Sequence, residues 1–405
     1  MFKTTFTLLA ILLTIQLSAQ SNAQWRGDNR DGIYNESGLL KQWPENGPEL
    51  LWQYDLLGAG HASAAVTEEI VYTAGTNETD GFIIAFDHSG KEIWKTVYGK
   101  EWLENWDGVR STPTIYEGKV YQLSGYGVIY CFDGNTGDIL WQEDLIEKFG
   151  AQNIKFGITE NLVVDEDKVF VTIGALDASV IALHKDTGII LWKCTGTGEK
   201  SAYCSPALIQ LPEAKIFVTH TEKHILCINP INGELIWKHE FLNKYVTHAN
   251  TPFYHEGYLY CVTGTAAGGV KIELAPNGDF IKEVWRNTTL DSKLGGFIFT
   301  EGRICGAGDA NKNWSCIDWE SGKELFNSTE ISKKGNVIYA DGLMYWYSES
   351  GEIALVEVQE DKFNIISKFE VPFGEKWHWS HLVIHNKKLY VRHGSYLMVY
   401  DIAAK

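Results

Sequence analysis

The apolar residues of this chain come in short alternating runs separated by glycine-containing turns, and the same phrase returns many times. The clearest copy is YCFDGNTGDILW at 130–141, in which an apolar strand, a tight turn and a strand with a large aromatic residue follow one another. Further copies recur every 41 to 51 residues, at 83–94, 181–192, 226–237 and 315–326, with looser ones ending at Trp285 and Phe369. Period-2 alternation between turn residues predicts β-strands. A unit of this length that repeats along a chain indicates a propeller or a solenoid.

The turn inside each phrase has a chemistry of its own. A tight hairpin visits positive φ at least once, and glycine adopts that conformation without a steric penalty. An Asp or Asn a few residues earlier can accept hydrogen bonds from the backbone of the turn; these residues are Asp87, Asp133, Asn229 and Asp318. The aromatic residue of the next strand is large and flat enough to cover the seam between neighbouring units. We therefore expect each phrase to form the outer half of a four-stranded sheet.

Eight inner strands can be counted, but only seven are followed by an outer strand of their own. The last unit, 378–402, ends after three strands, whereas LLWQYDL at 50–56 resembles an outer strand. Pairing 50–56 with the last three strands closes a ring and removes the free sheet edges. The sequence thus predicts an all-β, eight-bladed β-propeller of four-stranded antiparallel blades over residues 50–405. Seven blades is the alternative, because the unit at 330–371 is the least regular.

Residues 1–23 resemble a secretory signal sequence, with a lysine, an apolar run and then small residues. We expect cleavage after Ala19 or Ala23 and export to the periplasm or the medium. No cysteine stands at the cleavage point to carry a lipid anchor, and no later segment is apolar enough to span a bilayer. Residues 24–49 fall outside the repeat and are expected to form an N-terminal arm packed on the propeller.

The acidic net charge of the chain limits the kinds of molecule that it is expected to bind. The formal net charge is −17, which disfavours nucleic acid and anionic membranes. The acidic residues are dispersed along the chain, as on a solvated exterior, and we expect a monomer.

Seven cysteines are present. Five of them fall at recurring strand positions, some of which carry alanine in other units, so we expect small, buried packing residues there: Cys131, Cys227, Cys261, Cys305 and Cys316. Cys194 and Cys204 flank a loop between two units and are a possible disulfide pair. No CxxC pair exists, so the usual spacing of a zinc site is missing.

The D-x-x-T-G-x-x-x-W phrase, clearest at 133–141 and 185–192, resembles the PQQ-binding-like β-propeller repeat family of the quinoprotein alcohol dehydrogenase-like superfamily. Trp25-Arg26-Gly27 with Arg30-Asp31-Gly32 is similar to exported bacterial members. The resemblance covers about residues 25–402 and implies the propeller fold. It also implies two kinds of activity: oxidation of alcohols or sugars with PQQ and calcium, or binding of partner proteins, as in the outer-membrane β-barrel assembly lipoprotein.

Propellers bind ligands at one end of the channel, where the loops leading into the inner strands converge. Counting back from the second strands places mostly polar and aromatic residues there: His61, Arg110, Glu160, Tyr203, His248, Asn250, Lys333, His378, Trp379 and His381, with Trp102, Trp106 and Trp377 in adjoining loops. Trapped water can solvate such a ring. Alternatively, Arg110 forks onto a carboxylate or phosphate, and a tryptophan offers a flat face to a sugar or quinone ring.

Other chemistry has little support in the sequence. GxSxG, HExxH, Walker and dinucleotide motifs are absent, and the spacing of the histidines defines no metal site. Vicinal cysteines of the kind that large alcohol-oxidising quinoproteins carry are also absent. We expect an exported, non-enzymatic propeller that binds a partner protein or a small anionic or sugar-like ligand at the channel mouth. The alternative is a PQQ-dependent alcohol or sugar dehydrogenase with PQQ and calcium as cofactors; no catalytic residue is assigned.

Overall fold

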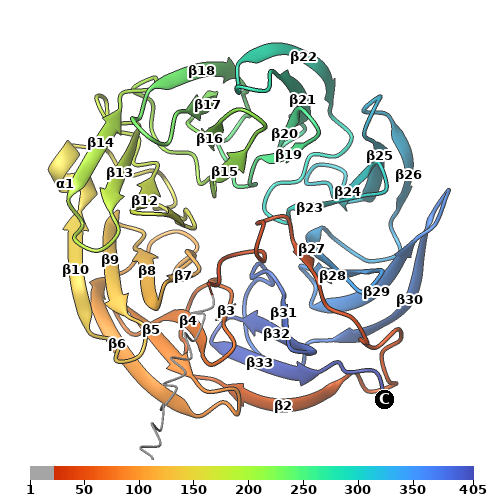
Figure 1. Ribbon diagram of the computed structural model, residues 1–405. Helices are drawn as coiled ribbons and strands as arrows, with labels where there is room; N and C mark the ends of the chain where they lie inside the picture. Colours follow the sequence, from red (N-terminus) through yellow and green to blue (C-terminus); the bar gives the residue numbers. More distant parts are fainter. Residues whose placement is uncertain (1–21) are drawn as a thin grey trace, which may run out of the picture.

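Eight antiparallel sheets stand in a ring around a central axis in the computed structural model, which describes residues 22–405 (Figure 1). Each blade has four antiparallel strands, and one blade gains a fifth, short strand from the arm. The predicted eight-bladed propeller is therefore confirmed, and the seven-bladed alternative is wrong.

Blade 1 consists of β3 (Ala65–Val66), β4 (Val71–Thr76), β5 (Asp80–Phe86) and β6 (Glu92–Lys100), and blade 2 of β7 (Thr114–Tyr116), β8 (Lys119–Leu123), β9 (Val128–Asp133) and β10 (Ile139–Asp144). Blade 3 consists of β11 (Val163–Asp165), β12 (Lys168–Val171), β13 (Val180–His184) and β14 (Ile190–Cys194). Blade 4 consists of β15 (Ala207–Gln210), β16 (Lys215–His220), β17 (His224–Ile228) and β18 (Leu235–Glu240). One short helix, α1 (Leu145–Phe149), follows β10.

Blade 5 consists of β19 (Phe253–His255), β20 (Tyr258–Thr263), β21 (Gly268–Leu274) and β22 (Phe280–Asn287), and blade 6 of β23 (Phe297–Thr300), β24 (Arg303–Ala307), β25 (Trp314–Asp318) and β26 (Glu324–Ser328). Blade 7 consists of β27 (Gly335–Ala340), β28 (Leu343–Ser348), β29 (Glu352–Val358) and β30 (Phe363–Glu370). Blade 8 consists of β31 (Val383–His385), β32 (Lys388–His393), β33 (Tyr396–Asp401) and β2 (Glu49–Tyr54).

The last blade is completed by the start of the chain, as the sequence predicts. Strand β2 pairs antiparallel with β33, from Glu49 opposite Asp401 to Tyr54 opposite Leu397. The first and last parts of the propeller are thus joined by backbone hydrogen bonds, which leaves no open seam in the ring.

The repeated phrase links each blade to the next. A Cβ added to Gly137 of blade 2 would lie 2.5 Å from the Trp94 ring of blade 1. The indole Nε1 of Trp94 donates to the carbonyl oxygen of Gly134 at 3.0 Å. Gly137 also has φ +76°, in the left-handed region that favours glycine. Trp52, Trp141, Trp192 and Trp285 pack in the same way on a glycine of the following blade. The phrase is therefore blade-to-blade packing chemistry.

The carboxylate of Asp133 accepts hydrogen bonds from the backbone of its own turn, at 2.9 Å from Asn135 N and 2.9 Å from Thr136 N. Asp87, Asn229 and Asp318 bond their own turns similarly. This confirms the role that the sequence predicts for these residues.

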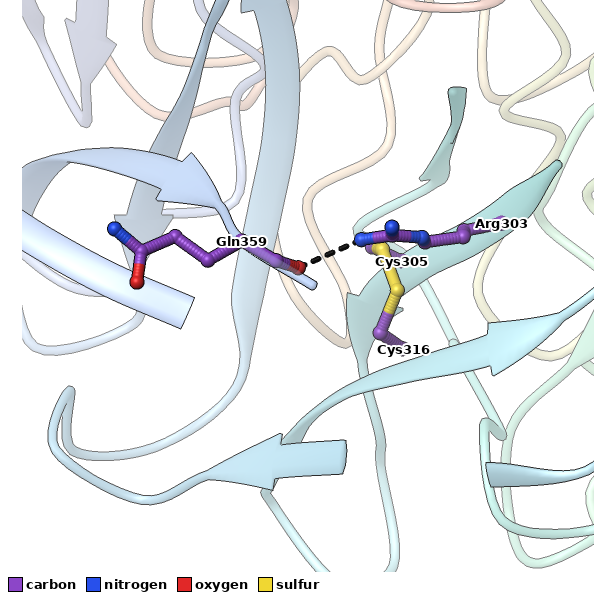
Figure 2. The surroundings of a disulfide bond; sticks show 4 residues. All are labelled: Arg303, Cys305, Cys316 and Gln359. Atoms are coloured by element: carbon purple, nitrogen blue, oxygen red, sulfur yellow. Dashed lines mark hydrogen bonds between the residues drawn. A yellow bond between two sulfur atoms is a disulfide. The ribbon is translucent and has the colours of Figure 1, made fainter. Parts of the chain in front are cut away.

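The cysteines follow the packing prediction only in part. Cys131, Cys227 and Cys261 are buried free thiols. Cys305 and Cys316 stand directly opposite each other on β24 and β25 and form a disulfide, with Arg303 and Gln359 nearby (Figure 2). The possible pairing of Cys194 with Cys204 is wrong, because both are free and buried. Cys194 lies at the end of β14, while Cys204 points to the carbonyl oxygen of Asn250.

The arm before β2 runs through the middle of the ring (Figure 1). Ala23 forms an isolated antiparallel bridge with Ile115, and β1 (Ile33–Tyr34) pairs in parallel with β27. Arg26 is buried between these points and donates to the carbonyl oxygens of Asp31, Phe297 and Val337 at 2.9, 2.9 and 3.0 Å.

Arg30 makes a second set of bonds from the arm. Its guanidinium is buried and donates to the carbonyl oxygens of Asn161 and Leu162, and its Nε donates to Oε1 of Gln24 at 2.7 Å. Two buried guanidinium groups thus tie the arm to inner loops of several blades.

The N-terminal prediction is only partly covered by the structure. Of residues 1–23, positions 1–21 lie outside the described residues, including the predicted cleavage point after Ala19. Between residues 22 and 405 no helix has the length and apolar character required to cross a membrane.

Candidate functional site

A cavity of about 370 Å³ opens at the channel mouth, where the outer strand of each blade leads into the inner strand of the next. All eight blades contribute to its wall, and Trp25 of the arm joins them. The residues that matter for its chemistry are Trp25, His61, Trp106, Arg110, Phe156, Tyr203, Lys293, Lys334, Glu349, Trp377, Trp379 and His381.

Three tryptophans form one wall of this mouth cavity. The rings of Trp377 and Trp379 are stacked with centroids 5.6 Å apart and planes 9° apart. Trp106 lies 5.1 Å from Trp379 and 5.9 Å from Trp377. Trp106 and Trp377 are 44% and 39% exposed, unusually open for such large rings. The plane of Trp106 is inclined by 55° to Trp379 and by 63° to Trp377. The wall is therefore an angled aromatic cluster, whose exposed rings can stack on a planar group.

Arg110 supplies a cation that lacks a carboxylate partner in the described part of the chain. Its Nη2 donates to the carbonyl oxygen of Phe156, and its buried Nε has no hydrogen-bond partner. The nearby acids are already engaged: Glu101 accepts from Tyr98 at 2.7 Å, and Asp107 pairs with Lys376 at 2.6 Å. Burial lowers the pKa of Arg110 to about 10, so the guanidinium is still protonated at neutral pH.

Two lysines add to the positive charge of the cavity wall. Lys334 forms ion pairs with Asp309 and, at 3.8 Å, with Glu349. Glu349 also accepts a 2.7 Å hydrogen bond from Nε1 of Trp379, which orients that ring. Lys293 lines the same cavity, and no ion pair holds its ammonium group within residues 22–405. The mouth is cationic in a chain whose net charge is −17.

The two histidines of the cavity are neutral. Burial, then the charges of Arg392 and Arg110, lower the pKa of His61 to about 3. Burial, then Arg26, lower the pKa of His381 to about 3. Nε2 of His381 donates to the carbonyl oxygen of Leu294 at 2.9 Å, which leaves Nδ1 to accept from Arg26 at 3.0 Å. His381 is therefore a fixed neutral side chain.

Seven of the predicted mouth residues line the cavity: His61, Arg110, Tyr203, Trp379, His381, Trp106 and Trp377. The other six do not. Glu160 is buried and accepts from Thr172 N at 3.0 Å, and burial raises its pKa to about 8. Asn250 bonds the backbone of Ser292 and Gly296.

The remaining four also lie outside the cavity, three of them because they pack elsewhere. His248 stacks on His220 with centroids 5.1 Å apart, and His378 stacks on His393 with centroids 3.5 Å apart. Trp102 is buried and donates to Asn105 O. Lys333 is exposed outside the cavity, whereas the next residue, Lys334, lines it.

Lys293, Lys334, Phe156 and Trp25 line the cavity although the sequence did not single them out. Lys334 differs from the predicted Lys333 by one position, and Lys293 directly precedes the inner-strand start at Leu294. Trp25 belongs to the arm motif noted in the sequence, but its place in the cavity depends on the path of the arm across the channel.

The donor set of the mouth does not fit calcium. Ca²⁺ takes six to eight oxygen ligands, whereas Glu349 is the one carboxylate on the cavity wall, already bound to Trp379 and near Lys334. Across the described residues, no group of three or more His, Cys, Asp or Glu side chains is arranged to hold a metal ion. We derive no catalytic step through calcium at this site.

Fold and site together define a PQQ-like β-propeller with an aromatic, cationic cavity at one end of a channel crossed by its own arm. The family model described as outer membrane protein assembly factor BamB matches residues 79–310, more than half of the chain. The chain belongs to this family.

Its curated relatives fall into two groups. It is 24% identical over 274 residues to the quinoprotein alcohol dehydrogenase PedH of Pseudomonas putida KT2440, covering 64% of this chain and 41% of PedH. It is 22% identical over 169 residues to BamB of Yersinia pestis, covering 40% of this chain and 39% of that protein. The matched region thus spans about two fifths of either relative.

Solved structures show the same fold. BamB from Moraxella catarrhalis matches with a TM-score of 0.64 and 13% identity, covering 87% of this chain and 99% of that one. Quinohemoprotein alcohol dehydrogenase from Comamonas testosteroni matches with a TM-score of 0.70 and 12% identity, covering 94% and 80%. At these identities the likeness concerns the fold alone.

Proposed function

We propose that this protein is an exported, non-enzymatic propeller that binds a small anionic, ring-bearing ligand in the mouth cavity. The observation that carries the proposal is the position of Arg110. Its guanidinium has an unpartnered, buried Nε and lines the same 370 Å³ cavity as a wall of three tryptophans. A carboxylate or phosphate would satisfy the guanidinium, while a planar ring or sugar face would stack on the indoles.

The size and lining of the cavity suit such a ligand. Small-molecule sites are about 300–1,000 Å³, mostly apolar, with a few placed polar groups. A partner protein is the other ligand to consider, because Trp106 and Trp377 are exposed at the rim and the BamB relatives are named as assembly factors. Arg110 favours the small molecule, because its side chain lines the cavity and is only partly exposed.

Export is part of this proposal. It rests on the signal-like residues 1–23 and agrees with the Cys305–Cys316 disulfide, since disulfides persist in oxidising compartments.

Isothermal titration with matched probes tests the proposal. We expect 2-naphthoate and glucuronate to bind, and the neutral analogues 2-naphthamide and glucose to bind about tenfold or more weakly, because the analogues cannot pair with Arg110. Arg110→Ala should remove the preference for the acid. Arg286→Ala, which removes an exposed arginine paired with Glu283 outside the cavity, is the control. Equal binding of acids and neutral analogues would overturn the proposal.

A quinoprotein-like alcohol or sugar dehydrogenase is the second candidate function, and the similarity to PedH favours it. Its test is reduction of an artificial electron acceptor by the purified protein with PQQ, calcium and a panel of alcohols and sugars. Cofactor-dependent turnover would replace the binding proposal. Absence of both turnover and PQQ binding would exclude the dehydrogenase.

A further inference from the structure

The two unpaired cations of the mouth cavity stand on opposite sides of the ring. Arg110 precedes β7 and belongs to the loop leading into blade 2, whereas Lys293 precedes β23 and leads into blade 6. Blades 2 and 6 are four steps apart in a ring of eight, so these two loops face each other across the axis (Figure 1). Both side chains line the same cavity.

Neither cation is neutralised by the protein at close range. The acids near Arg110 are held by Tyr98 and by Lys376. The charge of Lys293 helps to lower the pKa of Asp309, but the Asp309 carboxylate is already paired with Lys334. Two positive charges that line one cavity repel each other, and an anion between them removes that repulsion.

The stacked pair Trp377 and Trp379 comes from a loop midway between those of the two cations. Trp377 and Trp379 are in the loop leading into blade 8, which is two steps from blade 2 and two steps from blade 6. A planar ligand bound against this pair therefore lies between the loops of Arg110 and Lys293 and can present one group to each.

We propose that the mouth cavity selects a planar, ring-bearing ligand with two anionic groups, one at each end, held by Arg110 and Lys293. This inference rests on the proposed binding function and specifies the charge pattern of the ligand. A monoanion occupies only one of the two cationic positions and leaves the other cation unpaired in the cavity.

Titration of the full chain with naphthalene-2,6-dicarboxylate and with 2-naphthoate tests the inference. The diacid should bind about tenfold or more tightly than the monoacid, since each charge-assisted hydrogen bond contributes to affinity. Lys293→Met keeps the apolar stem of the side chain and should bring the affinity for the diacid down to that for the monoacid. Lys312→Met removes an exposed lysine of the same blade outside the cavity and should leave both affinities unchanged.

The outcomes separate the two proposals. Equal affinities for diacid and monoacid, unchanged in Lys293→Met, would overturn the two-ended ligand while leaving the anion-binding function standing. Failure of both acids to bind the wild-type chain would overturn both. Loss of the diacid preference in Lys312→Met as well as in Lys293→Met would show a general charge effect and would also overturn the inference.

Discussion

Nη1 of Arg26 lies 3.0 Å from Nδ1 of His381, and this contact joins the N-terminal arm to the wall of the mouth cavity. The other ring nitrogen of His381, Nε2, donates a hydrogen bond to the carbonyl oxygen of Leu294. The Trp25 ring contacts the His381 ring edge-on, with centroids 4.9 Å apart. The arm is therefore part of the cavity, and the integrity of the site depends on residues far from it in sequence.

Replacing Arg26 should destabilise the whole propeller. Arg26→Ala removes a buried guanidinium and leaves several buried carbonyl oxygens without a donor, so we expect a loss of about 3–5 kcal/mol in the free energy of unfolding. Urea denaturation measures it. Arg286→Ala, at the exposed ion pair with Glu283, should change the same quantity by less than about 1 kcal/mol. A loss below about 1 kcal/mol for Arg26→Ala would show that the arm is not needed for stability.

The glycine of the repeated phrase should be sensitive for two reasons that can be separated. Gly137→Ala introduces a Cβ 2.5 Å from the Trp94 ring at φ +76°, whereas Gly302→Ala at φ +73° meets no atom within 4 Å. Both variants carry the cost of the left-handed conformation, about 1–2 kcal/mol. Gly137→Ala should lose about 1–3 kcal/mol more, because Trp94 must move. Equal losses in thermal or urea unfolding would contradict the blade-to-blade role of the phrase.

Acid should unfold this protein at an unusually mild pH. Burial is the main cause that lowers the pKa of His61, His378 and His381 to about 3 and of His248 to about 4. In the unfolded chain a histidine titrates near pH 6.5. As the pH falls below 6.5, the unfolded state binds protons that the folded state does not, so stability decreases until the folded pKa values are reached.

Each histidine contributes about 1.4 kcal/mol per pH unit within that window. The four together should give a slope of about 5–6 kcal/mol per unit below pH 6. Glu160, with its pKa raised by burial to about 8, subtracts about 1.4 kcal/mol per unit, because the folded state keeps its proton. We expect a net slope of about 4 kcal/mol per unit, measured as urea midpoints between pH 7 and 5. His378→Asn should reduce the slope by about a third. A stability that is flat from pH 7 to 5 would contradict the buried, neutral state of these side chains.

The disulfide assignment predicts a defined pattern of thiols. Alkylation of the denatured, unreduced protein should label five of the seven cysteines. Peptide mapping should find Cys305 linked to Cys316, and not Cys194 to Cys204. The double variant Cys305→Ala/Cys316→Ala should be less stable by about 2–3 kcal/mol, as expected for a short closed loop. Seven labelled thiols would show that the bond does not form.

The fold was predictable because its determinants are local and repeated. Asp133, Gly137 and Trp141 recur with nearly the same spacing in other units, and a tryptophan ring packs on a glycine of the next blade at five seams. The lone outer strand around Trp52 revealed the closure, since eight inner strands needed an eighth partner. The path of the arm was not predictable, because the bonds of Arg26 and Arg30 reach carbonyl groups in distant blades.

The site was predictable only in part, because loop conformation decides which side chain faces the cavity. Lys333 has φ +66° and lies outside, while Lys334 turns inward to Asp309. His378 stacks on His393 instead of lining the mouth. The disulfide depends on the register that sets Cys305 opposite Cys316 across a turn of irregular length.

The most direct test of the central claim is mass spectrometry of small molecules released from the natively exported protein. The account predicts an anionic, ring-bearing compound that is present with wild type and with Arg286→Ala, and lost with Arg110→Ala. Release of the same compounds from wild type and Arg110→Ala would contradict a ligand site at the channel mouth.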